Sequence, residues 1–221
     1  MKKYKYNLEL TKRLSKLYTG AVYDVMREMK IQNFVLPNTI RPLDPNISLS
    51  GPIWTCSGAI DVNISDHESL VSWTGLLSNA PSEHVIVCQP NDDTIAHMGE
   101  LSAETLNDKG VKGYVVDGGS RDNDFIKKLG WPVFFKYYTP KDVVGRWKVT
   151  SMGEPINIGG VTIETGDYLL GDIDGIIIIS SKDIEKIVNR AEVIMQTENQ
   201  GRKKILEGMY PQQAYLKYGV F

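Results

Sequence analysis

Strand-like and helix-like segments alternate through the middle of the chain, and this alternation constrains the fold more than any other feature. Apolar runs occupy 84–89 (HVIVCQ), 114–117 (YVVD) and 133–136 (VFFK), and segments with helical periodicity over 99–107 and 123–129 separate them. Such alternation is typical of parallel strands in a sheet covered by helices. Ligand sites in these sheets gather at the carboxyl ends of the strands. We therefore predict an α/β fold whose functional residues directly follow strands.

The flanking segments add helices and short strands to this pattern. The stretch 34–51 carries three prolines, which exclude a long helix and favour an extended connection. No internal repeat or linker divides the chain, so we predict a single domain over residues 1–221. The further elements expected are helices over 10–17, 21–29, 65–79 (capped by Ser65 or Asp66) and 182–206, and strands over 53–56, 59–62, 156–158, 161–164, 168–171 and 176–179.

The charge balance excludes partners that are attracted by gross electrostatics. The chain has 25 Lys and Arg against 27 Asp and Glu, a formal net charge of -2, so we expect no nucleic-acid partner. Its longest apolar run, near 176–179, is far shorter than the ~20 residues that span a bilayer, and the charged start has no apolar signal-peptide region. We expect a soluble, cytoplasmic protein with no membrane partner. Cys56 and Cys88 lie in apolar strand-like runs, and buried thiols are the favoured interpretation.

The segment from Met98 to Asp122 is the best candidate for a functional site. Gly99 opens a predicted helix whose first amides, on Glu100, Leu101 and Ser102, have no acceptor within the helix. These amides carry the positive end of the helix dipole and suit a small anion.

The strand 114–116 then ends in the turn Asp117-Gly118-Gly119-Ser120, which delivers Arg121 and Asp122 to the same edge. The planar fork of Arg121 suits a carboxylate, and Asp122 and Glu100 supply the hard oxygens that Mg²⁺ prefers. Together these groups suit an α-keto acid chelated to a divalent cation. A plainer interpretation stays open, in which Glu100 is an ordinary first-turn acid, Arg121 and Asp122 form a surface pair, and the glycines form a simple turn.

Other polar groups are weaker candidates. Asp92, Asp93, His97 and Glu100 form an acid- and histidine-rich group that suggests a metal cluster, with a helix-entry role for His97 as the alternative. We expect His67 and His84 to be surface or capping residues. Lys136, at a strand end, keeps a Schiff-base reaction open as a minor option.

Several motifs resemble one known family over nearly the whole chain. They are Gly99-Glu100-Leu101, the run VVDGGSRD over 115–122, the strand WPVF over 131–134, and PINIGGV over 155–161 leading to TGD at 165–167 and GDIDG at 171–175. The chain resembles the family that joins the regulator of ribonuclease activity A with the 4-hydroxy-4-methyl-2-oxoglutarate aldolases, which are class II pyruvate aldolases. In its aldolases an acidic residue is followed, after twenty residues, by Arg-Asp. Glu100, Arg121 and Asp122 reproduce that spacing.

The resemblance implies a site and an assembly. It implies that Asp122 binds Mg²⁺ or Mn²⁺, that Glu100 holds a metal-bound water, and that Arg121 contacts the keto acid. It also implies that the helix start at Gly99, Leu101 and Ser102 binds the substrate carboxylate. The implied fold is a three-layer β/β/α swivelling-domain-like α/β fold with a mixed sheet and a long C-terminal helix, and the implied assembly is a homotrimer or homohexamer.

The C-terminal segment 182–221 is expected to contact a neighbouring subunit. Its tail carries Tyr210, Tyr215, Tyr218 and Phe221, whose aromatic surface would be wet in a monomer unless the tail folds back on its own subunit. Related aldolases place a glutamate of this region in a neighbouring active site, and Glu198 is the position that we match to it.

These features predict a divalent-metal-dependent aldolase, a carbon-carbon lyase that cleaves a 4-hydroxy-2-oxo acid to pyruvate and a carbonyl product. Oxaloacetate decarboxylation needs only the enolate half of that chemistry and is expected as a side activity. Two alternatives stay open. One is a non-catalytic regulator that binds a ribonuclease, since the family contains such members. The other is an enzyme of sugar-acid breakdown that uses the same enolate chemistry on another substrate.

Overall fold

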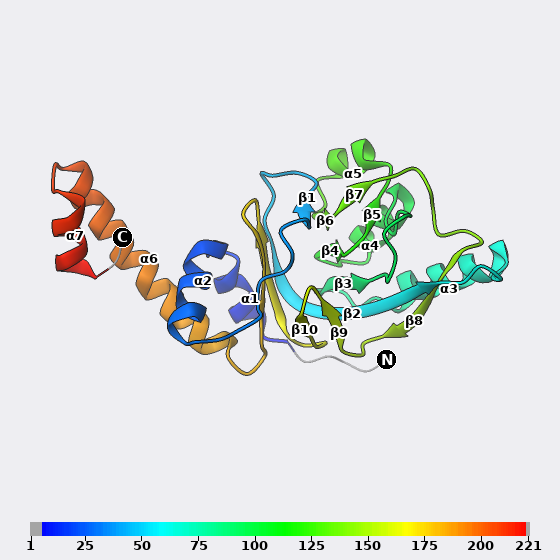
Figure 1. The fold of residues 1–221 in the computed structure, drawn as a ribbon, viewed down its shortest axis with the longest axis horizontal. Helices are drawn as coiled ribbons and strands as arrows, with labels where there is room; N and C mark the ends of the chain where they lie inside the picture. Colours follow the sequence, from blue (N-terminus) through cyan, green and yellow to red (C-terminus); the bar gives the residue numbers. More distant parts are fainter. Residues whose placement is uncertain (1–5, 220–221) are drawn as a thin grey trace.

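A mixed sheet of eight strands forms the centre of the computed structural model, which describes residues 6–219 (Figure 1). Its order is β1-β6-β4-β3-β2-β11-β12, and β8 pairs with β2 beside this path. The strands of this sheet are β1 Arg41–Pro42, β2 Leu49–Ile60, β3 Val85–Gln89, β4 Gly113–Val116, β6 Val133–Phe135, β8 Trp147–Met152, β11 Tyr168–Asp172 and β12 Gly175–Ile179. Two small pairs accompany it, β5 Gly119–Ser120 with β7 Tyr137–Tyr138 and β9 Ile156–Ile158 with β10 Val161–Ile163.

The neighbours β2, β3, β4 and β6 run parallel, and β11, β12, β1 and β8 pair antiparallel at the margins. Alternate side chains of β3 point to opposite faces, as strand geometry requires. Ile86 and Cys88 pack into a core with the helices α3, α4 and α5, whereas Val85 and Val87 pack toward the β9–β10 hairpin and β12. The helices are α1 Leu8–Leu14, α2 Thr19–Glu28, α3 Asp66–Asn79, α4 Glu100–Asp108, α5 Asn123–Leu129, α6 Ile184–Leu206 and α7 Pro211–Tyr218.

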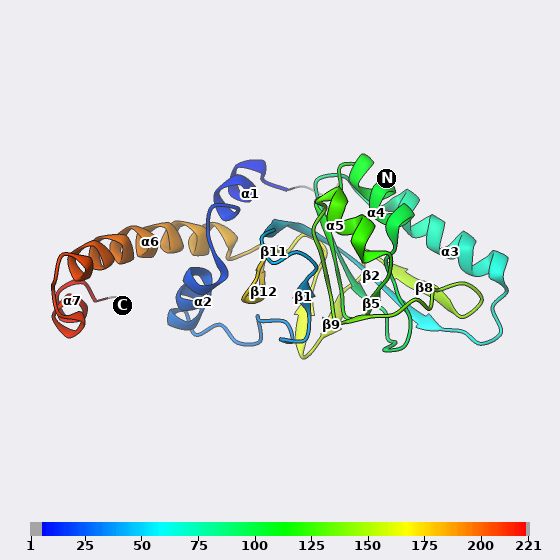
Figure 2. The same ribbon diagram turned by 90° about the horizontal axis from the view of Figure 1, so that it is seen from above.

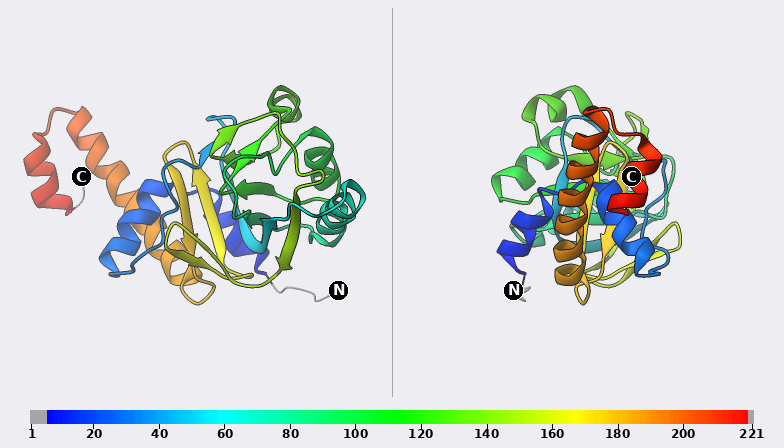
Figure 3. Two further views of the ribbon diagram at one scale, coloured as in Figure 1. Left: turned by 45° about the vertical axis from the view of Figure 1, so that its right-hand side comes forward. Right: turned by 90° about the vertical axis from the view of Figure 1, so that its left-hand side faces the viewer.

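This architecture confirms the predicted mixed α/β fold with a long C-terminal helix. A third core lies where α1, α2 and the first half of α6 pack on β11 and β12 through apolar side chains such as Val22, Leu170 and Val188. The second half of α6 then extends away from the sheet, and α7 folds back beside it (Figure 2). Figure 3 shows this C-terminal arm, residues 195–219, on the opposite side of the sheet from α3, α4 and α5. No helix in residues 6–219 is long and apolar enough to cross a membrane.

The predicted helices and hairpins are confirmed in most places, but one strand was divided and several elements were not predicted, the short strands β1, β5 and β7 among them. The strands expected at 53–56 and 59–62 are one strand, β2, whose pairing with β8 shifts between Ser57 and Gly58. Strand β8 and helix α7 were not predicted. The Ser65 cap of α3 is confirmed, because its hydroxyl accepts from the Glu68 amide while the Glu68 carboxylate accepts from the Ser65 amide.

The buried thiols are confirmed and one histidine prediction is wrong. Cys56 and Cys88 are both free, buried and opposite each other on β2 and β3, and the hydrogen bond from the neighbouring thiol together with burial raises the pKa of Cys56. His67 is exposed as expected. His84 is not a surface residue: it is buried, its Nδ1 lies 2.8 Å from the Ser82 carbonyl oxygen, and Tyr6 packs edge-on against its ring.

Candidate active site

The first turn of α4 meets the turn after β4 at the carboxyl edge of the parallel strands. Gly99 caps the helix, and the first hydrogen bond within the helix runs from the Ala103 amide to the Gly99 carbonyl. The amides of Glu100, Leu101 and Ser102 therefore have no acceptor within the helix. A Cβ on Gly99 would lie 2.9 Å from Asp122 Oδ2 and 3.3 Å from Arg121 Nε. Glycine is needed here because the two side chains approach the backbone so closely.

Asp122 has an unusual backbone conformation that directs its carboxylate to this helix start. Its φ of 57° and ψ of 32° lie in the left-handed region, which aspartate tolerates better than most residues. Its Oδ2 accepts from the Glu100 amide at 3.3 Å and lies 3.4 Å from Arg121 Nε. Strained conformations of this kind concentrate at functional sites.

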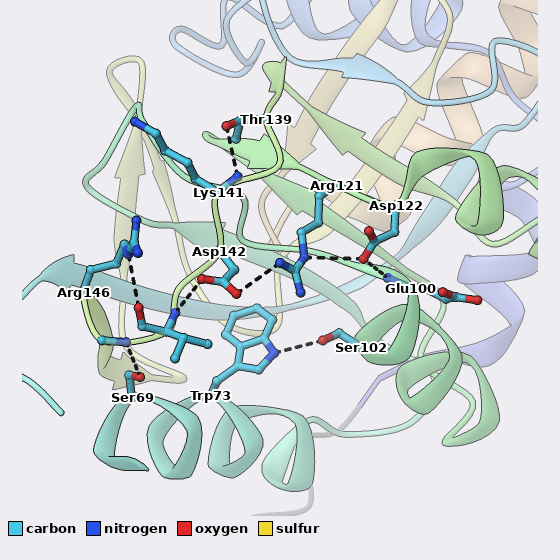
Figure 4. A network of polar contacts seen from close by, with 12 residues as sticks. Ser69, Trp73, Glu100, Ser102, Arg121, Asp122, Thr139, Lys141, Asp142 and Arg146 are labelled. Carbon is cyan, nitrogen blue, oxygen red and sulfur yellow. Dashed lines mark hydrogen bonds and ion pairs between the residues drawn. The ribbon is translucent and has the colours of Figure 1, made fainter. Parts of the chain in front are cut away.

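Arg121 is held from its other side by Asp142, a residue that the sequence did not point to. Arg121 Nη1 donates to Asp142 Oδ2 at 3.1 Å, and Asp142 Oδ1 accepts from the Val144 amide at 3.2 Å (Figure 4). Asp142 comes from the irregular segment between β7 and β8. The guanidinium is therefore fixed between two aspartates, and no residue in the described part of the chain takes up its Nη2 donors.

A cleft of about 520 Å³ opens in front of these groups. One wall is α3, where Trp73 Nε1 donates to Ser102 Oγ at 2.9 Å and so ties α3 to α4 (Figure 4). The other lining groups are largely apolar, with Leu70 and Leu77 on α3, Leu101 on α4 and Val143 beside Asp142. A mostly apolar cleft with a few convergent polar groups is the usual form of a small-molecule site.

His97 lies in the cleft wall and is fully buried. Its ring packs edge-on against Trp147 with centroids 5.3 Å apart, and its Nε2 is 3.6 Å from Asp92 Oδ2. Burial lowers the pKa of His97 to about 4, against the opposing effect of Asp92, so the ring is neutral at pH 7. Gly118 makes this packing possible, because a Cβ there would lie 2.7 Å from His97 Nδ1.

The structure brings some of the predicted site residues together and leaves others apart. Gly99, the Glu100 amide, Arg121 and Asp122 converge, whereas the Glu100 carboxylate points away from Arg121 (Figure 4). Ser102 contributes its hydroxyl to Trp73, and Leu101 lies on the rim.

Glu198 lies on α6, where it accepts a hydrogen bond from the Tyr18 hydroxyl, whose pKa burial and Glu198 raise to about 12. Helix α6 lies on the opposite side of the sheet from α4 (Figure 1). Lys136 is also outside the cleft, and its ammonium lies 2.7 Å from Asp117 Oδ1.

The acid- and histidine-rich group that suggested a metal cluster converges only in part, with Asp92 beside His97 and no group of three within residues 6–219. Asp92 instead accepts from the Thr94 and Ile95 amides, and Glu100 is not part of its surroundings. Within residues 6–219, no three His, Cys, Asp or Glu side chains gather closely enough to hold a metal together.

The groups at the helix start nevertheless fit a hydrated divalent cation. The Asp122 carboxylate is partly exposed and packs directly on Gly99, and the Glu100 carboxylate in the first turn of α4 has no partner within residues 6–219. Such a site supplies one or two protein oxygens and leaves the remaining positions to water and ligand, which is how proteins usually bind Mg²⁺.

Comparison with known proteins places the chain in a family. The family model described as "RraA-like: Aldolase/RraA" matches residues 19–178, and the chain belongs to this family. A protein of Halalkalibacterium halodurans named "Putative 4-hydroxy-4-methyl-2-oxoglutarate aldolase" is 28% identical over 185 residues, which cover 82% of this chain and 83% of that protein.

Two solved structures have the same fold over most of their length. One, described as novel cellulases from microbes associated with the gut ecosystem, is 34% identical with a TM-score of 0.82 and covers 90% of both chains. The other is Streptomyces coelicolor RraAS2, described as an unusual member of the RNase ES inhibitor RraA protein family. It is 23% identical with a TM-score of 0.79, covers 90% of this chain and 98% of that one, and shows the fold alone.

Proposed function

We propose that the protein is a divalent-metal-dependent lyase that cleaves a 4-hydroxy-2-oxo acid to pyruvate and a carbonyl product. The observation that carries this proposal is the fixed guanidinium of Arg121, held between Asp142 and Asp122 at the open amides of α4. Guanidinium and helix-start amides bind carboxylates, and the neighbouring Asp122 is suited to a cation. Membership of the family described as Aldolase/RraA supports the same reaction class.

In this proposal the amides of Leu101 and Ser102 bind the C1 carboxylate, and the Nη2 donors of Arg121 bind the substrate's oxo-acid end. Asp142 and Asp122 keep the guanidinium in one orientation, so little rotamer freedom remains to be lost on binding. Asp122 is the residue that would hold Mg²⁺ or Mn²⁺, and Glu100 would act through a water. When bound, the cation polarises the 2-oxo group as a Lewis acid.

Cleavage then needs a group that accepts the proton of the C4 hydroxyl, and the C3–C4 bond must break. The Glu100 carboxylate, through a water, accepts the proton of the C4 hydroxyl. The C3–C4 bond breaks, its electron pair passes to C3 to give the enolate of pyruvate, and C4 becomes an aldehyde or ketone. Protonation of C3 releases pyruvate, so the reaction consumes no co-substrate. Oxaloacetate would lose CO₂ through the same enolate.

The experiment is pyruvate release measured with lactate dehydrogenase and NADH. Purified protein with Mg²⁺ or Mn²⁺ is given a panel of 4-hydroxy-2-oxo acids and oxaloacetate, with EDTA as the control. We expect metal-dependent pyruvate formation. Release of glucose from cellooligosaccharides without pyruvate from any oxo acid would contradict the proposal.

A second candidate is a non-catalytic regulator of a ribonuclease, supported by the fold shared with the RraAS2 structure. It predicts a stoichiometric complex with a ribonuclease and no turnover of any oxo acid. The fixed Arg121 favours the lyase, because a docking surface has no need of an arginine oriented inside a cleft.

A further inference from the structure

The cleft is lined by more negative than positive side chains. This excess bears on which group the substrate carries at the end that lies away from Arg121. Three carboxylates line it, on Glu100, Asp122 and Asp142, and Arg121 is the single Lys or Arg among the described lining residues. Arg121 already faces Asp142 and Asp122 at 3.1 and 3.4 Å. With a bound divalent cation this group of charges sums to zero, and one substrate carboxylate takes the sum to -1 and a second to -2. Among the described residues that line the cleft, a second carboxylate finds no positive partner.

The basic residues around the rim do not supply a positive partner for a second carboxylate. Lys109 Nζ donates to the carbonyls of Leu77 and Ser78 at the end of α3, at 2.6 and 2.8 Å. Arg146 Nε donates to the Val144 carbonyl, and neither Arg146 nor Lys141 lines the cleft. Figure 4 shows the Lys141 side chain extending away from Arg121. The buried His97 ring is neutral at pH 7.

Beyond Arg121 the lining of the cleft is apolar. Leu101, in the first turn of α4, is 76% exposed, and Leu70, on the facing helix α3, is 45% exposed. Both line the same cleft as Arg121, so a ligand held at Arg121 has them within the same cleft. Trp73 and Val143 continue the apolar wall. Exposed leucines that line a ligand cleft lose water when an apolar group packs against them, which favours such a group.

We infer that the substrate is a 4-hydroxy-2-oxo monocarboxylic acid whose C4 substituent is a hydrocarbon group that packs against the apolar lining of the cleft, to which Leu70 and Leu101 belong. This inference rests on the proposed function and narrows its substrate class. The cleavage products are pyruvate and an aliphatic or aromatic aldehyde. The atoms balance as in the general reaction, because only the group attached to C4 is specified.

The test uses two pairs of compounds that have equal numbers of non-hydrogen atoms and differ in charge. The cleavable pair is 4-hydroxy-6-methyl-2-oxoheptanoate and 4-hydroxy-2-oxoadipate, compared by kcat/KM for pyruvate release. The uncleavable pair is 5-methyl-2-oxohexanoate and 2-oxoglutarate, compared by calorimetric binding in the presence of Mg²⁺. We expect the apolar member of each pair to be favoured by about tenfold or more, the scale on which pockets discriminate such groups.

Variants assign the preference to the two leucines. Leu101→Arg and Leu70→Arg place a cation on the exposed rim, and each is expected to shift the ratio of kcat/KM toward the dicarboxylate by about tenfold. Val62→Arg is the matched control, because Val62 is 82% exposed and does not line the cleft. It should leave the ratio unchanged, and thermal melts verify that all three variants fold.

The outcomes separate the inference from the proposed function. Preference for 4-hydroxy-2-oxoadipate and 2-oxoglutarate would overturn the inference and leave the lyase proposal standing. Pyruvate release from neither cleavable compound, together with no binding of either uncleavable one, would overturn both. An equal shift in the Val62→Arg variant would also overturn it, since the preference would then come from net charge.

Discussion

Two arginine–carboxylate pairs on opposite sides of the molecule show what distinguishes a site from a surface. Arg190 of α6 pairs with Glu28 of α2 at 3.2 Å, and both side chains are about half exposed beside an open groove of about 710 Å³. Arg121 pairs with Asp142 at a similar 3.1 Å. Exposed pairs such as Arg190–Glu28 contribute little stability, at most about 1 kcal/mol.

The difference lies in what surrounds each pair. Arg121 is joined by a second aspartate in a left-handed conformation, by a helix start with open amides, and by glycines that leave no room for a side chain. The Arg190 groove lies along regular helices whose apolar faces are already packed. Ion pairing alone therefore does not identify a site, whereas the close approach of Arg121 and Asp122 to a helix start at Gly99 does.

The largest expected effect is at Asp122. Asp122→Ala should lower kcat/KM for pyruvate release by about 10³-fold or more and remove its dependence on Mg²⁺, because the variant loses the carboxylate proposed to hold the cation. The measurement is the steady-state rate over a Mn²⁺ titration, with circular dichroism to verify the fold. Glu28→Ala, which breaks the Arg190 pair, is the control. A rate near wild type at saturating Mn²⁺ would mean that the cation binds elsewhere.

A pH-dependent effect on stability comes from His97. Its pKa is about 4 in the folded protein and about 6.5 in an unfolded chain, so the unfolded state takes up a proton first as the pH falls. The contribution of His97 to the free energy of unfolding should therefore decrease by about 3 kcal/mol from pH 6.5 to pH 4 and level off below that. Burial also lowers the pKa of His84, which adds to the same slope.

Urea unfolding at pH 8, 6, 5 and 4 measures this slope. His97→Gln should flatten it, whereas His67→Gln, at an exposed position on α3, should leave it unchanged. An unaltered slope in His97→Gln would show that other groups carry the pH dependence.

The same substitution at Arg121 and at Arg190 compares the two ion pairs directly. Arg121→Lys should lower kcat/KM by about 10²-fold, because an ammonium cannot reproduce the planar fork that spans Asp142, Asp122 and the ligand. Arg190→Lys should leave kcat/KM within twofold of wild type. Equal losses in both variants would indicate a general effect of arginine on stability, which thermal melts would detect.

The close approach at Gly99 predicts a smaller loss. Gly99→Ala places a methyl group 2.9 Å from Asp122 Oδ2, so the carboxylate must shift, and we expect kcat to fall about tenfold with little change in melting temperature. Gly75→Ala is the matched control. Its Cβ has open space on α3, and the change should be neutral or stabilising by up to about 1 kcal/mol.

The smallest expected effect concerns the C-terminal arm. Leu206 and Leu216 are largely exposed within the chain, and we predict a trimer or hexamer in which this segment packs on a neighbour. Removing 209–221 should weaken association and lower activity a few-fold, measured by light scattering and rate on the same samples. Phe221, which was expected to take part, lies outside the described residues. An active monomer, unaffected by the truncation, would contradict this prediction.

The sequence predicted regular elements well where one physical signal dominated. The apolar run 84–89 and the capped helix 65–79 appear almost as expected, because alternation and capping act locally. Strand β2 was divided in two because Ser57-Gly58 resembles a break. In the structure Gly58 continues the strand, since the Trp147 indole packs where its side chain would be. Strand β8 was missed because Lys148 and Thr150 make it largely polar and exposed.

The candidate site was predictable only in part. Local patterns in the sequence reveal the helix start at Gly99 and the strand that precedes Arg121 and Asp122. The family resemblance supplied the roles of these residues. Asp142 was not found because it lies 21 positions beyond Arg121 in an irregular segment without periodicity or motif. The burial of His84 was missed for a similar reason, since it depends on Tyr6 and on contacts between distant segments.

In the proposed reaction, the Arg121–Asp122 end of the cleft forms and protonates the enolate of pyruvate. Exchange of the pyruvate methyl hydrogens with deuterium, followed by proton NMR in D₂O, tests this step without knowledge of the second product. We predict Mg²⁺- or Mn²⁺-dependent loss of the methyl signal with the wild-type protein and with Arg190→Lys, and no loss above background with Asp122→Ala. No exchange with the wild-type protein and either metal, or undiminished exchange with Asp122→Ala, would contradict the account.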